Sequence, residues 1–211
     1  MDKVDKLFSQ RYINHWVHEH NEILEQFKPF MEMPSKHLTK AGSHAIKWTC
    51  EIPTTMYNEH VDELPWDTIR PHILNAADEL LQSYKPKQEC NYEINVNGFW
   101  LNYYNRGTFQ ELHDHVDYGM EFSFAYMLAL EDHEDSGQFN FYNDNQWIRS
   151  RFPSGYFEDP TCETVFSPES RQGTLLVFPS DVKHFVTMHN RDSLRATISG
   201  NIGIKYKIQG F

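Results

Sequence analysis

Three side chains that could bind a metal occupy alternate positions of the stretch ELHDHVDYGM: His113, His115 and Asp117. Alternate residues of an extended strand point to the same face, so a strand here would present all three side chains together. A single metal ion needs ligands that converge on one point, with coordination positions left open if the site is catalytic. The stretch therefore predicts a metal site to which two of these three residues contribute.

Strand geometry limits which of the three can bind the same ion. Neighbours on one face lie about 6.6 Å apart and residues four positions apart about 13 Å, whereas a histidine nitrogen lies roughly 2.1 Å from its metal. His113 and Asp117 therefore cannot share an ion unless the strand breaks between them, and His115 belongs to either pair. Geometry alone leaves the choice between His113 and Asp117 open.

A third ligand is expected from a distant strand. His184 follows the apolar run TLLVFP and a Pro-Ser-Asp turn, and it begins another strand-like segment. Arg195 comes eleven residues after His184, in LRATISGN. On a strand, Arg195 and Thr197 would share a face, which would place a guanidinium beside a hydroxyl where a carboxylate could be bound through two hydrogen bonds.

In this order the residues resemble the iron(II)- and 2-oxoglutarate-dependent oxygenases, which are double-stranded β-helix, or jelly-roll, proteins. The resemblance covers roughly residues 92–206. A Tyr-x-x-Gly motif is similar to Tyr104 to Gly107, and the histidine cluster, the lone histidine and the later arginine follow it. A narrower resemblance is to oxygenases of marine cyanobacterial phages and some bacteria, and it rests on Trp100, Asn102, Gly107, Gln110, His113, His115, Ser123, Phe178, Pro179, Ser180, His184, Arg195 and Thr197.

The resemblance implies that the histidine cluster and His184 hold Fe(II). It also implies that the distal carboxylate of 2-oxoglutarate is bound, and the residues for this are Arg195, Tyr104, Asn102 and Thr197. The His-x-His spacing of the narrower group favours the ligand set His113, His115 and His184. The superfamily's preference for one carboxylate favours His115, Asp117 and His184. We follow the spacing, and the second set remains open.

Composition narrows the classes of partner. The net charge of −11 disfavours nucleic acid and anionic membranes, which attract clustered Lys and Arg. The three cysteines are odd in number and far apart, so a disulfide framework is not expected. We expect the protein in a reducing cytosol. For a phage protein, this would be the cytoplasm of the host. The N-terminus lacks the apolar core of a signal peptide, and no run approaches the roughly 20 apolar residues of a membrane span.

The elements that must position these residues fall into two parts. Helical spacing of apolar residues predicts helices over 6–31 and 65–84, and AIKWTCEI is a candidate strand. After Pro86 the pattern changes to aromatic and β-branched runs divided by turn residues, which predicts an antiparallel sandwich or barrel. The runs are YEINVNGFWLNYY, EFSFAYMLAL, GQFNFYND, GTLLVFP, KHFVTMH and LRATISGNIGIKYKI. We therefore expect a mainly β jelly roll, with residues 1–88 as a helical flank and 89–211 as the core.

The leading hypothesis is a cytosolic dioxygenase that decarboxylates 2-oxoglutarate to succinate and hydroxylates a small-molecule or peptidyl substrate. The long aromatic and charged segment 143–168 is expected to cover the substrate. One alternative is a cupin-like metal enzyme without 2-oxoglutarate, which would not need Arg195. The other is a non-catalytic jelly-roll module of a virion or a sugar-binding protein.

Overall fold

Two antiparallel sheets form the core of the protein, as a computed structural model shows for residues 10–32, 36–39, 50, 52–86, 90–144 and 163–208. The five-stranded sheet has the order β1 (Ile13–Trp16), β7 (Thr174–Pro179), β4 (Phe122–Ala129), β9 (Arg195–Ile208) and β2 (Cys90–Tyr104). The four-stranded sheet has the order β3 (Gln110–His113), β8 (His184–Val186), β5 (Phe139–Tyr142) and β6 (Val165–Phe166).

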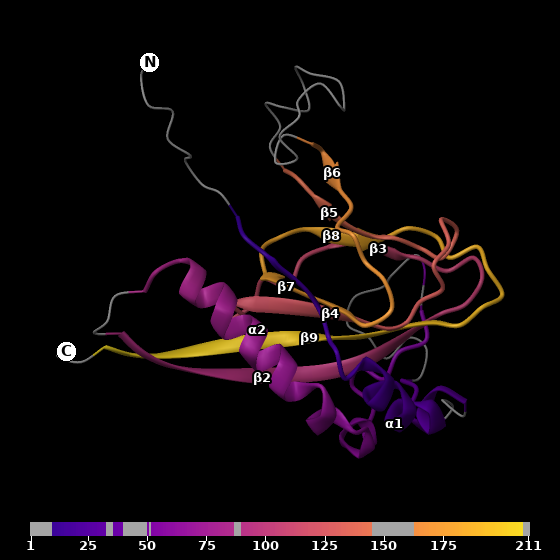
Figure 1. Cartoon of the computed structure of the whole chain (residues 1–211), viewed down its shortest axis with the longest axis horizontal. Coiled ribbons are helices and arrows are strands. Elements are labelled where there is room, and N and C mark those ends of the chain that lie inside the picture. The colour runs from indigo at the N-terminus through magenta and orange to yellow at the C-terminus, as the bar shows by residue number, and fades with distance from the viewer. Residues whose placement is uncertain are drawn as a thin grey trace.

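The helices cover the outer face of the five-stranded sheet (Figure 1). They are α1 (His20–Glu32) and α2 (Arg70–Ser83), with the short 3-10 helices η2 (Val61–Glu63) and η3 (Trp66–Thr68) before α2. Residues of α1 and α2 are buried against side chains of β2, β4, β7 and β9. The four-stranded sheet lies on the opposite side of the five-stranded sheet (Figure 1).

Strands β4 and β7, in the middle of the five-stranded sheet, are buried on both faces, which explains why their sequences are almost continuously apolar. In β7, Leu175 and Val177 pack in the cluster beneath the helices, while Leu176 and Phe178 pack in the second cluster, which includes residues of β5 and β8 in the other sheet. This alternation follows from the two-residue period of a strand. A mainly β fold with flanking helices, as the sequence predicts, is confirmed.

The first helical prediction is partly wrong. Within the range 6–31, Ile13–Trp16 form strand β1, which pairs with β7 in the register Ile13 to Val177, and the helix begins only at His20. The local helical pattern is overridden because these residues complete the edge of a sheet. Gly173, with φ +87°, lets the chain before β7 lie close to the end of β1, because a Cβ at this position would lie 2.8 Å from Nε1 of Trp16.

The second helical prediction agrees with η3 and α2, and each of the six predicted runs contains a strand. Most of the candidate strand AIKWTCEI lies outside the described residues, as does 145–162 of the predicted substrate cover. The domain boundary near residue 88 stays a prediction, although β1, from the N-terminal side of it, is hydrogen-bonded into the core sheet. Among the described residues, no helix is both long and apolar enough to span a membrane.

Candidate metal centre and co-substrate pocket

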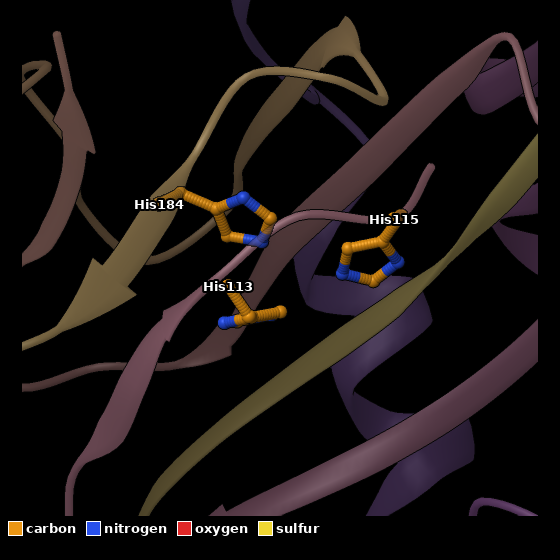
Figure 2. Close-up of side chains that lie close together, drawn as sticks. All are labelled: His113, His115 and His184. Carbon is orange, nitrogen blue, oxygen red and sulfur yellow. The ribbon is translucent and has the colours of Figure 1, made fainter. Parts of the chain in front are cut away.

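Three histidines from two strands and a loop converge on one point. His113 is the last residue of β3 and His184 the first of β8, and the two are paired across the four-stranded sheet. His115 lies two residues beyond β3, where its backbone N–H donates to the carbonyl of Ser180 at 2.9 Å. One ring nitrogen from each histidine lies within 4.8 Å of the others, and the rings turn toward a common centre (Figure 2).

Hydrogen bonds at Nδ1 determine which nitrogen each ring offers. Nδ1 of His113 lies 2.6 Å from the carbonyl of Glu111, and Nδ1 of His184 lies 2.9 Å from the carbonyl of Val182. A carbonyl can only accept, so both rings carry their proton on Nδ1 and have the lone pair on Nε2. Nδ1 of His115 makes the equivalent contact with Oδ1 of Asn201 at 2.7 Å. This pattern is typical of histidines that bind a metal through Nε2.

The surroundings keep the three rings neutral. Burial is the main cause that lowers the pKa of each histidine. The neighbouring His113 lowers the pKa of His115 further, to about 4, and also contributes to the pKa of His184, which lies well below its usual value. Neutral imidazoles at pH 7 are the form that a metal requires.

Asp117 does not join this cluster. Its side chain is exposed, and Oδ1 accepts a hydrogen bond from the backbone N–H of Tyr118 at 2.6 Å. Because β3 ends at His113, the strand does break before Asp117, contrary to the extended geometry assumed for this stretch. The structure thus brings together His113, His115 and His184, while Asp117 lies on the wall of the adjoining cavity. The ligand set itself stays a prediction.

The histidines lie in a cavity of about 960 Å³ that extends between the two sheets. Three of the residues predicted to bind 2-oxoglutarate, Tyr104, Asn102 and Thr197, line its wall. Asn102 and Tyr104 belong to β2 and Thr197 to β9, and Asn102 and Thr197 are register partners. The amide of Asn102 contacts Oγ of Ser199 at 3.4 Å.

Arg195 is buried behind Tyr104, a residue of the cavity wall, and only 1% of its surface is exposed. Its Nε donates to the carbonyl of Gly137 at 3.1 Å, and its guanidinium carbon lies 4.0 Å from the ring centre of Tyr104. Neither terminal nitrogen has a hydrogen-bond partner among the described residues. Burial lowers the pKa of Arg195, and the nearby Tyr104 acts in the opposite direction. A guanidinium whose two terminal nitrogens are both unpaired can bind a carboxylate through them.

Two further residues contact the cluster: Asn201, which the sequence patterns did not single out, and Trp100, which entered only as a residue of the narrower resemblance. Asn201 continues the alternation of Arg195 and Thr197 along β9, so the two-residue period could have indicated it. Trp100 stacks on His115, with the ring centres 5.9 Å apart and the planes 8° apart. No local pattern connects Trp100 with His115, because the contact joins β2 to a loop.

Comparisons with known proteins agree with this architecture. Residues 98–201 match the family described as "Putative 2OG-Fe(II) oxygenase". A search of curated proteins found no match to the sequence. Among solved structures, a prolyl-4-hydroxylase of Pseudomonas putida is similar, with a TM-score of 0.54, 15% identity and coverage of 92% of this chain and 93% of that chain.

Two further structures are similar at comparable levels. EctD from S. alaskensis has a TM-score of 0.60 and 14% identity, with coverage of 92% and 73% of the two chains. HygX from Streptomyces hygroscopicus, solved with nickel and 2-oxoglutarate, has a TM-score of 0.55 and 11% identity, with coverage of 91% and 82%. At such low identities these likenesses show the fold alone, which is the predicted jelly roll.

Proposed function

Residues 98–201 belong to the putative 2OG-Fe(II) oxygenase family, whose cofactors are Fe(II) and 2-oxoglutarate, and from this premise we propose that the protein is a hydroxylase. Its reaction would decarboxylate 2-oxoglutarate to succinate and hydroxylate a second substrate. We propose His113, His115 and His184 as the iron ligands. Arg195, Tyr104, Asn102 and Thr197 are the proposed binding residues for 2-oxoglutarate.

One observation carries the proposal: three converging neutral imidazoles lie in a cavity whose wall includes Tyr104, and a buried arginine with two unpaired terminal nitrogens lies against the ring of Tyr104. Imidazole nitrogen is a ligand that suits iron, and three ligands leave coordination positions for a co-substrate and dioxygen. A buried guanidinium without an anionic partner is costly, so its presence here is best explained by a bound carboxylate. The residues present therefore fit both cofactors.

In this assignment, the chain's own residues bind and orient while the cofactors provide the redox chemistry. Bound Fe(II) with 2-oxoglutarate supplies dioxygen activation. Arg195 binds the distal carboxylate through its two terminal nitrogens, and Tyr104 supports it from the face of the guanidinium. Asn102 and Thr197, which line the cavity wall, orient the co-substrate between the histidines and Arg195.

The second substrate would enter from the side of the cavity formed by the loop after β3. Leu112, near the end of β3, and Val116, in the loop, line the cavity and are exposed, and Met120 lines the cavity as well. The charged Asp114, Asp117 and Lys183 line the cavity as well. A cavity with apolar walls and a few charged groups suits a small molecule or a peptide side chain, and nucleic acid and membranes are not proposed as partners.

The test is an anaerobic titration of the protein with Fe(II) and then 2-oxoglutarate, followed by visible absorption. We expect a weak charge-transfer band when both are bound, because 2-oxoglutarate chelates the metal. His184→Ala should give no band at any concentration, since it removes a ligand. Absence of the band in the wild-type protein at saturating concentrations would refute the proposed function and favour a metal enzyme without 2-oxoglutarate, or a binding module.

A further inference from the structure

His115 differs from the other two histidines in what orients its ring. His113 and His184 each donate from Nδ1 to a backbone carbonyl two residues earlier, so their own segments hold them. His115 lies beyond the end of β3, and its Nδ1 contacts Oδ1 of Asn201, 86 residues away on β9. The orientation of this ring therefore depends on a side chain of the opposite sheet.

The amide of Asn201 is itself held in place by a buried polar chain. Its Oδ1 also accepts from Oγ of Ser123 at 3.2 Å, and Oγ of Ser123 lies 3.1 Å from Oγ of Ser180. Asn201, Ser123 and Ser180 are all buried. The chain closes on the same loop, because the carbonyl of Ser180 accepts from the backbone N–H of His115. Rotation of the amide would break both contacts of Oδ1 among buried side chains.

The indole of Trp100 also restrains the ring of His115, by stacking on its face. The indole is almost parallel to the imidazole of His115, at an interplanar angle of 8°. Stacking limits tilt of the ring, but it cannot select which nitrogen carries the proton. That selection falls to Asn201, since a carbonyl oxygen accepts and therefore requires a proton on Nδ1.

We propose that Asn201 is a positioning residue that holds His115 as the Nδ1–H tautomer and so directs the lone pair of Nε2 toward His113 and His184. This inference rests on the proposed function, because it assigns His115 a metal-ligating role. It also gives a role to Ser123 and Ser180, two residues of the narrower resemblance. They are not part of the histidine cluster, and they hold the amide of Asn201 in place. A ring with its proton on Nε2 could not bind through that atom.

The direct test is the tautomer of His115 in the metal-free protein, read from long-range nitrogen-proton NMR spectra of protein labelled with ¹⁵N-histidine. The signals of His115 are identified by their loss in His115→Gln. The wild type should show the Nδ1–H form. Asn201→Ala should show the Nε2–H form or a mixture, while Asn201→Asp, which keeps an oxygen acceptor, should retain Nδ1–H. An Nε2–H form in the wild type would overturn the inference.

Metal affinity is the second readout, measured by equilibrium dialysis against Zn(II) and, anaerobically, Fe(II). Loss of an outer partner of a metal ligand typically weakens binding 10- to 100-fold, so we expect this range for Asn201→Ala. Asn201→Asp should bind at least as tightly as the wild type. The matched control is Ser199→Ala, two positions away on the same face of β9, which should stay within about twofold of the wild type.

The outcomes separate this inference from the proposed function. If the wild type binds neither metal, the proposed function fails. If the wild type binds but Asn201→Ala binds equally well with an unchanged tautomer, the inference alone fails. Equal losses in Asn201→Ala and Asn201→Asp would show a merely structural role and would also refute it. Should Asn201→Ala not fold, Asn201→Asp and Ser123→Ala decide the matter, because only the first should preserve wild-type affinity.

Discussion

At the scale of single residues, Arg195 is a buried charge without an ionic partner among the described residues. A fully buried guanidinium that makes one hydrogen bond, to Gly137, and leaves two nitrogens unpaired among the described residues loses much of its hydration without compensation. The ring of Tyr104 offsets part of this cost through its π face. Such residues persist where function requires them, and a carboxylate would satisfy both nitrogens at once.

Arg195→Met tests this balance, because methionine keeps a long side chain and removes the charge. Affinity for 2-oxoglutarate should fall at least tenfold, since a charge-assisted carboxylate pair contributes roughly 1.5 to 3 kcal/mol. The free energy of unfolding of the cofactor-free protein should be equal or higher, because an uncompensated charge leaves the interior. Isothermal titration and urea unfolding measure the two effects. Unchanged affinity would contradict the role of Arg195, and iron content serves as the control.

The two candidate ligand sets differ by one residue each, and iron retained after desalting with a mild chelator distinguishes them. His115→Ala and His184→Ala should lose iron under either set. We expect His113→Ala to abolish binding, because its ring nitrogen lies within the cluster. Asp117→Ala should weaken binding by no more than about 10- to 100-fold, as for an outer residue. The reverse result would establish the set with the carboxylate.

Much of this cluster was predictable because strand alternation and motif order constrain it. His113, His115 and His184 stand in the expected order, and the structure brings them together. That Asp117 lies apart from the three histidines was not predictable from spacing, since it depends on β3 ending at His113. Asn201 was missed because its contact with His115 spans two sheets, although it follows Arg195 at strand period on β9.

At the scale of elements, β9 forms the strand that its sequence predicts, whereas the segment from β1 to α1 begins with a strand where its sequence predicts a helix. β9 was predicted as a run of alternating residues, and its inward face carries the proposed co-substrate and positioning residues. The segment 13–20 reads as helix locally, but pairing with β7 makes its first part a strand. Its local pattern could not reveal this, because the partner strand lies more than 150 residues away.

The junction between β1 and α1 is anchored by a buried histidine, which gives a pH-dependent prediction. His20, the first residue of α1, is 4% exposed, and its Nδ1 lies 2.6 Å from the hydroxyl of Tyr126 on β4. Burial lowers the pKa of His20 below its usual value of 6.5. The unfolded chain therefore takes up a proton first as the pH falls, so the contribution of neutral His20 to stability is complete above about pH 6.5 and declines below it.

Urea unfolding at pH 7.5, 6.5 and 5.5 should show this decline. Relative to His20→Gln, which does not titrate, the wild type should lose stability toward pH 5.5, by at most about 1.4 kcal/mol for each pH unit. The same substitution at the exposed His18 is the matched control. A stability difference between wild type and His20→Gln that is constant across the three pH values would contradict the assigned environment of His20.

At the scale of the whole molecule, the proposed cofactor site joins the two sheets. His113 and His184 belong to the four-stranded sheet, whereas Arg195 and Asn201 belong to the five-stranded sheet. The helices pack on the outer face of the larger sheet. The packing of the two sheets against each other therefore depends on the second apolar cluster and on contacts around the cavity. Bound metal and 2-oxoglutarate would therefore act as links across the core, and their removal should lower the stability of the entire domain.

Thermal unfolding with and without metal measures this link. A ligand present at 100 times its Kd stabilises the folded state by about 2.7 kcal/mol. For a chain of this size each kcal/mol raises Tm by about 2 to 4 °C, so saturating anaerobic Fe(II), or Zn(II) as a redox-inert substitute, should raise Tm by about 5 to 10 °C. Adding 2-oxoglutarate should raise Tm again in the wild type with Fe(II), and by less in Arg195→Met at the same concentration. His184→Ala should show no metal-dependent shift, and a shift equal to that of the wild type would mean that the metal binds elsewhere.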